Sequence, residues 1–111
     1  GLDGVYENPR HLQPPKYTIT ETKYREGGRY IDSDGSASDS ALSMTKNSGK
    51  QMSSTWINNH LRNEFKDNPY LRREIEEEGY VSLLMIVDET GKVVAISKLN
   101  SAGRTIQGIR P

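Results

Sequence analysis

The stretch "GYVSLLMIVDETGKVVAIS", from Gly79 to Ser97, is the part of this chain with the composition of a folded core. Apolar residues fill both of its halves, and the segment "DETG" between them is typical of a tight turn, with Gly91 supplying a positive φ. We therefore predict a β-hairpin. Because a two-stranded hairpin is not stable alone in water, other segments must cover it or leave an edge for a partner.

Both faces of the predicted hairpin carry apolar side chains. Alternation along the first strand places Leu83 and Met85 on one side and Leu84 and Ile86 on the other. We expect one face to pack on helices, whereas the other needs partial cover or a partner.

Two helices are predicted before the hairpin. The first covers "SSTWINNHLRNEF", in which Ile57, Leu61 and Phe65 recur every four residues and form one apolar stripe. The second begins with Asn68 as the cap and Pro69 in the first helical position, a combination typical of helix starts. It covers "YLRREIEEE" and ends at Gly79.

The rest of the chain divides into four predicted parts. Residues 1–16 carry three of the five prolines and are expected to be a flexible arm. Residues 17–32 begin with the alternating "YTITETKY" and contain a possible edge strand, since both of its faces are polar. Residues 33–52 are rich in serine without an apolar period and are expected to be a mobile loop. Residues 53–111 are expected to form the core, in which the C-terminal segment after Leu99 adds a short third strand.

These elements predict an α+β fold, with two helices packed on a small antiparallel sheet built around the hairpin and a flexible N-terminal region. The 111 residues are enough for one domain, and the hydrophobic content of 32% is low for it. The formal net charge of zero argues against a nucleic-acid-binding or membrane-surface protein. There is no cysteine and no apolar run of membrane-spanning length. Because the chain begins with Gly1, we expect that an export or anchoring segment was trimmed away.

No catalytic, cofactor or metal site is predicted. The segment "DSDGSASD" from Asp32 to Asp39 has acidic residues and a glycine, but Gly35 comes too early for an EF-hand loop. His11 and His60 lie in unrelated segments without a metal-ligand spacing. No serine stands in a nucleophile-elbow context, and no phosphate-binding glycine loop is present. We therefore expect a protein that is not an enzyme.

The order helix, helix, strand, turn, strand carries a resemblance to a known family. The stretch "WINNHLRNEFKDNPYLRREIEEEGYVSLLMIVDETGKVVAISKLNSAG" resembles the C-terminal domain of the TonB family, the periplasmic energy transducers. The family's hairpin pattern matches without a gap at positions that are glycine or apolar here: Gly79, Val81, Leu83, Met85, Val87, Gly91 and Val93. The family's final helix and strand have no counterpart after Gly103.

The resemblance implies a non-catalytic protein-binding module of the periplasm or cell envelope. It implies docking by strand addition, in which a protein or peptide, such as an outer-membrane receptor, pairs with an open sheet edge. The same edge would allow a homodimer, and contact with a membrane would need the trimmed anchor. The alternative is a structural domain of a surface lipoprotein or secreted assembly. The predicted partner-binding edge comprises Ala95, Ser97, Leu99, Thr105, Ile106 and Ile109.

Overall fold

The computed structural model describes residues 2–8 and 15–111, which form two α-helices, seven strands and a single 3₁₀ turn. The strands are β1 (Gly4–Glu7), β2 (Tyr17–Tyr24), β3 (Met44–Thr45), β4 (Gly49–Lys50), β5 (Tyr80–Val87), β6 (Val93–Leu99) and β7 (Thr105–Ile109). The helices are α1 (Ser54–Glu64) and α2 (Pro69–Glu78), and the 3₁₀ turn η1 is Asp39–Ala41.

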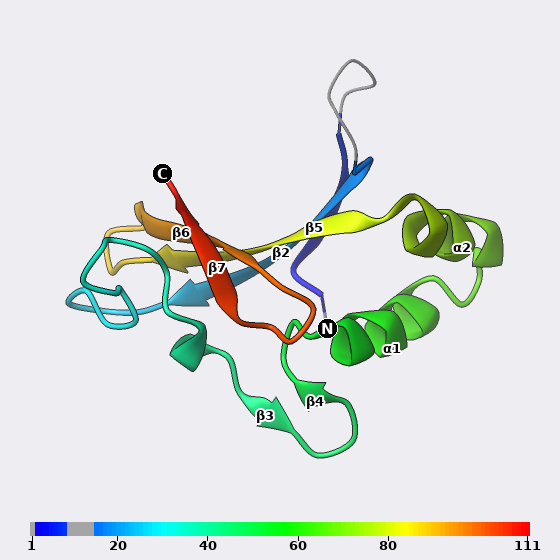
Figure 1. The fold of residues 1–111 in the computed structure, drawn as a ribbon, viewed down its shortest axis with the longest axis horizontal. Helices are drawn as coiled ribbons and strands as arrows, with labels where there is room; N and C mark the ends of the chain where they lie inside the picture. The colour runs from blue at the N-terminus through cyan, green and yellow to red at the C-terminus, as the bar shows by residue number, and fades with distance from the viewer. Residues whose placement is uncertain (1, 9–14) are drawn as a thin grey trace.

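The predicted α+β fold and its helices are confirmed, and the sheet is mixed rather than purely antiparallel. The strand order is β1-β2-β5-β6-β7, and only the β2–β5 pair among these is parallel. Helix α1 and the small β3–β4 hairpin lie on one side of this sheet, and α2 lies beyond the end at which β5 begins (Figure 1). The chain between β2 and β5 therefore crosses one face of the sheet, as a parallel connection requires.

The expectation that residues 17–24 form an edge strand is wrong. β2 lies inside the sheet, with β1 on one side and β5 on the other. Tyr17 and Ile19 are buried, and Thr20 is also buried on the opposite face. The threonines made both faces of the strand look polar, but β-branched side chains also pack well in an interior strand.

The predicted hairpin is confirmed as β5 and β6, with Leu84 opposite Ser97 and Ile86 opposite Ala95. The turn at its end is closed by two backbone hydrogen bonds between Asp88 and its partners Gly91 and Lys92. Gly91 has the predicted positive φ, of 84°.

The turn between β6 and β7 repeats this construction. Asn100 exchanges backbone hydrogen bonds with Gly103 and Arg104, and Gly103 has a φ of 75°. In each turn the first side chain, an Asp or an Asn, accepts hydrogen bonds from two backbone N–H groups inside the turn. The sequences "DETGK" and "NSAGR" thus fold into the same turn.

The core lies between the covered face of the sheet and the helices. Ser53 caps α1 by accepting a hydrogen bond from the Trp56 N–H (3.3 Å), and Asn68 caps α2 in the same way. The core combines buried side chains of both helices with buried side chains of β2, β5 and β6: Trp56, Ile57, Leu61, Ile75, Ile19, Leu84, Ile86, Ala95 and Leu99. α2 is also tied to the sheet by Glu74, which accepts hydrogen bonds from Tyr17 and Lys16.

Residues 33–52, expected to be a mobile loop, contribute to the core. Ala37, Leu42 and Met52 are buried, and the Ala37 carbonyl accepts a hydrogen bond from the buried Ser97 hydroxyl (2.8 Å). The segment lacks an apolar period because irregular backbone has none, so its buried residues could not be recognised from spacing. Its mobility stays a prediction.

The expected arm, residues 1–16, is only partly covered by the structure. Residues 4–7 form β1, which pairs with β2 through the register Gly4–Thr20 to Glu7–Tyr17. Residues 1 and 9–14 lie outside the described residues.

The positive φ of Gly91 leads to a first prediction. A side chain at this position is disfavoured by the backbone conformation, although the space around it is open. Gly91→Val should therefore lower the free energy of unfolding by more than about 1 kcal/mol, as measured by chemical denaturation. Gly91→Asn is the matched control and should lose clearly less, because Asn tolerates a positive φ. Equal losses for the two variants would contradict the backbone argument.

Candidate functional site

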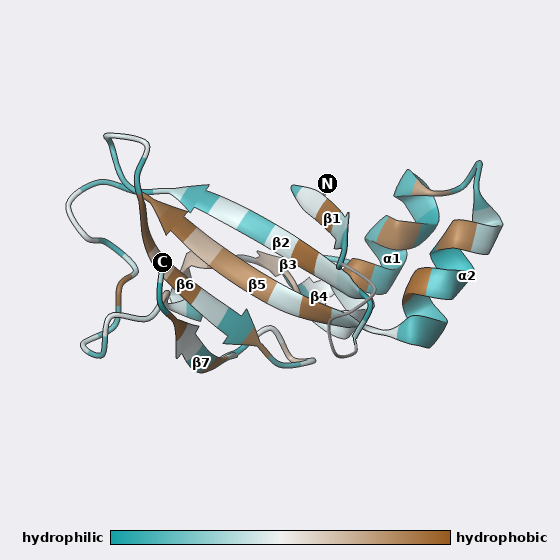
Figure 2. Ribbon diagram, turned by 90° about the horizontal axis from the view of Figure 1, so that it is seen from above, coloured by the Kyte–Doolittle hydropathy of each residue, from teal (hydrophilic) through white to brown (hydrophobic). Residues whose placement is uncertain are grey.

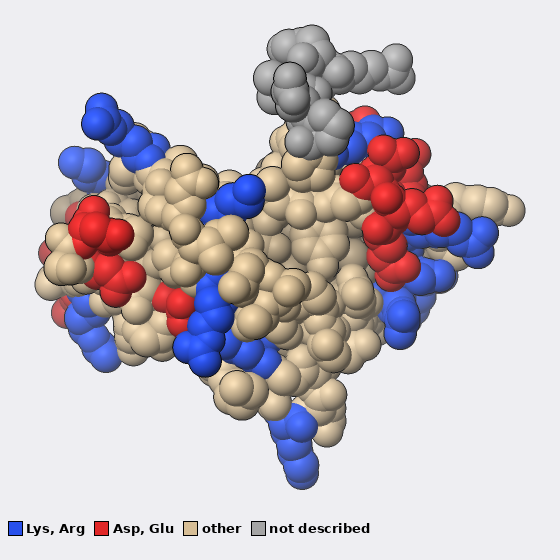
Figure 3. Space-filling model, viewed as in Figure 1, with Lys and Arg blue, Asp and Glu red and all other residues tan. Residues whose placement is uncertain are grey.

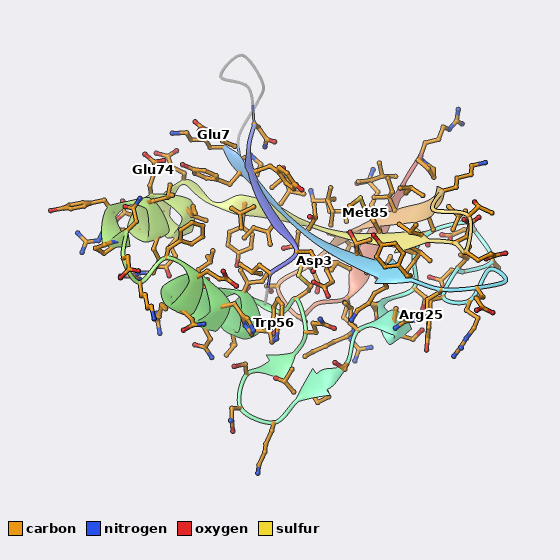
Figure 4. The ribbon with its side chains drawn as sticks, turned by 180° about the vertical axis from the view of Figure 1, so that it is seen from behind. Asp3, Glu7, Arg25, Trp56, Glu74 and Met85 are labelled. Atoms are coloured by element: carbon orange, nitrogen blue, oxygen red, sulfur yellow. The ribbon has the colours of Figure 1, made fainter. Side chains whose placement is uncertain are left out.

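The face of the sheet opposite the helices is covered by no described helix or loop. Met85 and Trp56 lie on opposite sides of the sheet (Figure 4). Brown bands along β5 and β6 mark their apolar residues (Figure 2), and alternation turns every second side chain of a strand to this open face. Most of these side chains are only half-buried: Val81, Leu83, Met85 and Ile96. The prediction that the hairpin has one thinly covered apolar face is therefore confirmed.

β7 forms one edge of this sheet, as the order of strands shows. Its predicted edge residues Ile106 and Ile109 are 55% and 38% exposed. No described strand lies on its outer side, so this side can accept another strand.

The part of the predicted edge that lies on β6 is wrong. Ala95, Ser97 and Leu99 belong to a strand that is paired on both sides, with β5 and with β7. All three are buried on the covered face. The tail supplies β7 as a further strand, so the edge moves outward from β6 to β7.

The first residue of β7 already has a partner on its outer side. The Asn100 N–H donates to the Arg104 carbonyl (2.8 Å), and Leu99 faces Thr105 in the next pair. In an antiparallel ladder, hydrogen-bonded and non-hydrogen-bonded pairs alternate, so the Thr105 N–H points away from β6. There it donates to the Asp39 Oδ2 (2.8 Å). The Asp39 carboxylate thus occupies the place that a neighbouring strand would take.

Asp39 is the centre of a polar cluster between the serine-rich segment and β7. Its Oδ1 lies 2.6 Å from Lys50 Nζ and 3.9 Å from the Arg104 guanidinium. Burial opposes ionisation most strongly, but the hydrogen bonds from Lys50 and the Thr105 N–H, together with the nearby cations, lower the pKa of Asp39 overall. The carboxylate is therefore held in its charged form.

The remainder of β7 is irregular and faces a hollow. The register with β6 shifts beside Leu99, so that Ile106 has no partner residue on β6. Such bulges are common at sheet edges, where they restrict indiscriminate pairing. Beyond the bulge an open hollow lies between β7 and the loop before η1, lined by Asp34, Gly35, Ser36, Gly108, Ile109, Arg110 and Pro111. The open part of the edge is therefore Gln107–Arg110.

The opposite edge of the sheet has a similar arrangement. β1 covers β2 only from Tyr17 to Thr20. Further along, the Thr22 N–H donates to the Asp3 Oδ2 (2.7 Å), and Asp3 lies beside β2 (Figure 4). An aspartate carboxylate therefore accepts an N–H group at each edge of the sheet.

The described residues contain no group of three or more His, Asp or Glu side chains that could hold a metal ion. His60 stacks on Trp56, with ring centroids 4.0 Å apart, and its Nδ1 lies 2.8 Å from the Trp56 carbonyl oxygen. His11 lies outside the described residues. Neither described helix is long and apolar enough to cross a membrane.

Comparison with known proteins identifies no relative. The chain matches no family model, no curated protein and no solved structure.

The Asp39 cluster leads to a second prediction. Asp39→Ala leaves the Thr105 N–H and Lys50 without their partner, and should lower the free energy of unfolding by roughly 1–3 kcal/mol. Because the pKa of Asp39 is lowered by folding, this contribution is present above the ordinary carboxyl range and is lost as the pH falls through the lowered value. The difference between wild type and variant, measured by denaturation at several pH values, should therefore shrink in acid.

Asp34→Ala is the control for this experiment. Asp34 lies in the same segment, and its carboxylate accepts hydrogen bonds from Ser36 within its own turn. Asp34→Ala should lower the free energy of unfolding less than Asp39→Ala does. It should also leave hydrogen exchange of the Thr105 amide unchanged, whereas Asp39→Ala should accelerate this exchange. Equal exchange of that amide in both variants would contradict the proposed capping by Asp39.

Proposed function

We propose that this domain is a non-catalytic protein-binding module that docks an extended peptide by adding a strand to β7. The observation that carries this proposal is the open edge at Gln107–Arg110, which lies beside a hollow on the same side. Main-chain groups of β7 would supply affinity, and the alternating side chains of the peptide would supply selectivity.

The surroundings of the edge favour docking between Gln107 and Arg110 rather than along the whole strand. The outer N–H of Thr105 is occupied by Asp39, and the bulge at Ile106 interrupts the ladder. Side chains of an incoming strand that point to the covered side would enter the hollow beside Ser36. Those that point to the other side would extend the open apolar face next to Ile109.

Charges near the edge indicate what kind of peptide it would bind. Basic side chains stand at both ends of β7, at Arg104 and Arg110, while acidic side chains gather over α2 (Figure 3). Arg104 already lies 3.9 Å from the Asp39 carboxylate, whereas Arg110 belongs to the open part of the edge. We therefore propose a partner strand with a carboxylate side chain, which would stand opposite Arg110. A homodimer through Gln107–Arg110 is the alternative, because antiparallel pairing of these residues brings each Arg110 opposite the neutral Gln107.

The TonB-like relationship and the location in the periplasm or cell envelope remain proposals that rest on the resemblance of the hairpin and helices. The alternative function is a structural domain of a surface lipoprotein or secreted assembly. The open apolar face favours this alternative if it is buried permanently in a larger assembly. The two functions differ in one respect, because only the first requires β7 to bind isolated peptides.

Selection from a displayed library of extended peptides, followed by NMR titration, tests the proposal. Bound peptides should shift the amide signals of Gln107–Arg110 and slow their hydrogen exchange. Ile109→Lys should weaken binding at least tenfold, because it places a charge where apolar contact is expected. It should leave the folded state intact, since Ile109 is 38% exposed.

Met44→Lys is the matched control, because it introduces the same charge at an exposed apolar position away from β7. Met44 is 74% exposed and lies in the β3–β4 hairpin. This variant should bind like the wild type. Binding that is equally weakened by both variants, or amide shifts confined to regions other than β7, would contradict edge docking.

A further inference from the structure

The side chain of Glu21 is buried on the covered face of β2 in an unusual environment for a carboxylate. It is 6% exposed. Its Oε2 accepts a hydrogen bond from Gln51 Nε2 (2.7 Å) and lies 3.5 Å from Lys23 Nζ. Its Oε1 is also buried but has no hydrogen-bond partner among the described residues. A buried oxygen without a donor destabilises the fold unless something supplies one.

A second carboxyl group lies beside Glu21. Asp3 immediately precedes β1 and is fixed by the hydrogen bond from the Thr22 N–H. The antiparallel register, with Gly4 opposite Thr20, brings Asp3 next to Glu21. Burial first, and then the charge of Asp3, raise the pKa of Glu21, while Lys23 acts in the opposite direction.

We propose that Asp3 and Glu21 form a proton-dependent latch that holds β1 on the edge of β2. A proton shared between the two carboxyl groups supplies the donor that Glu21 Oε1 lacks and removes the repulsion between them. Without this proton, two carboxylates lie side by side, and Lys23 is the one cation among the described residues that offsets them. Loss of the proton therefore weakens the docking of β1.

β1 is the element that responds, because its ladder is short. It has four residues paired with β2, whereas β2 is paired with β5 along its full length from Tyr17 to Tyr24. Two of the four, Tyr6 and Glu7, are exposed. Release of β1 would uncover the outer edge of Tyr17–Thr20 and create a second edge that can accept a strand, in addition to β7.

The direction of the pH dependence follows from the raised pKa of Glu21. Burial by the other segments raises the pKa of Glu21 in both forms, so the relevant window lies between its pKa in the undocked form and its higher pKa in the docked form. In this window the docked form binds more protons than the undocked form. Docking is therefore strongest below this window and weakens as the pH rises through it. The coupling between docking and proton binding works in both directions. If docking raises the pKa of Glu21 by one unit, protonation of Glu21 makes docking of β1 tenfold more favourable.

Hydrogen exchange and carboxyl titration by NMR test the latch on the wild-type chain and three variants. The protection of the β1 amides, corrected for the intrinsic pH dependence of exchange, should fall as the pH rises through the titration of Glu21. Glu21→Gln offers Asp3 a permanent N–H donor and should keep the protection at its low-pH level. Asp3→Asn removes the repulsion while its amide oxygen still accepts from Thr22, so it should act in the same way.

Glu7→Gln is the matched control. The carboxyl group of Glu7 lies on β1, close in sequence to Asp3. Its Oε1 is 3.5 Å from Lys16 Nζ, and it does not face Glu21. This variant should keep the pH dependence of the wild type. Protection of β1 that does not change with pH in the wild type, or that changes equally in Asp3→Asn, would overturn the latch. Because the readout is the docking of β1 and not the binding of a peptide at β7, it is independent of the proposed function.

Discussion

The parallel pairing of β2 with β5 is the constraint on which the rest of this structure depends. Parallel neighbours cannot be joined by a tight turn, so the connection must leave the sheet and return across one of its faces. Here the connection is the whole of residues 25–79, which includes the serine-rich segment and both helices. Among residues 2–8 and 15–111, the covering structure is therefore on one face or at one end of the sheet, and the other face is left open.

The same constraint accounts for the β7 edge, whereas the opposite edge is shaped by the segment before β1. The covering segment passes close to β7 and places Asp39 against Thr105, whereas the segment before β1 places Asp3 against Thr22. In both places a carboxylate accepts an N–H group that would otherwise be available to a neighbouring strand. The edges differ because Asp39 is surrounded by cations, while Asp3 lies beside another carboxyl group. The β7 edge is therefore capped at Thr105 by a cluster of opposite charges, whereas the proposed docking of β1 on the opposite edge depends on a proton.

The elements that could be predicted from the sequence are those specified by local patterns. The hairpin follows from alternation and from the turn at Gly91, and α2 follows from Asn68, Pro69 and Gly79. These signals work because the residues that interact are near each other in sequence.

The elements that could not be predicted depend on contacts between distant segments. Nothing in "YTITETKY" indicates a parallel partner beyond residue 79, so β2 was expected at an edge. Ala37 and Met52 are buried by irregular backbone, which has no period to recognise. β7 was expected, and Thr105, Ile106 and Ile109 of the predicted edge lie on it. Its pairing with β6 was not expected, so the half of the predicted edge on β6 is lost. The signal for Glu21 was its position on the same face as Tyr17 and Ile19, which gained significance only once that face was known to be covered.

Interstrand NOEs between β2 and β5 in the isotope-labelled protein test this account most directly. The account predicts backbone contacts between Ile19 and Ser82 and between Glu21 and Leu84, in a parallel register. Contacts in an antiparallel register, or contacts of β5 with β6 alone, would contradict it. In either case the connection would not need to cross one face of the sheet, and the explanation of the open face and its edges would fail.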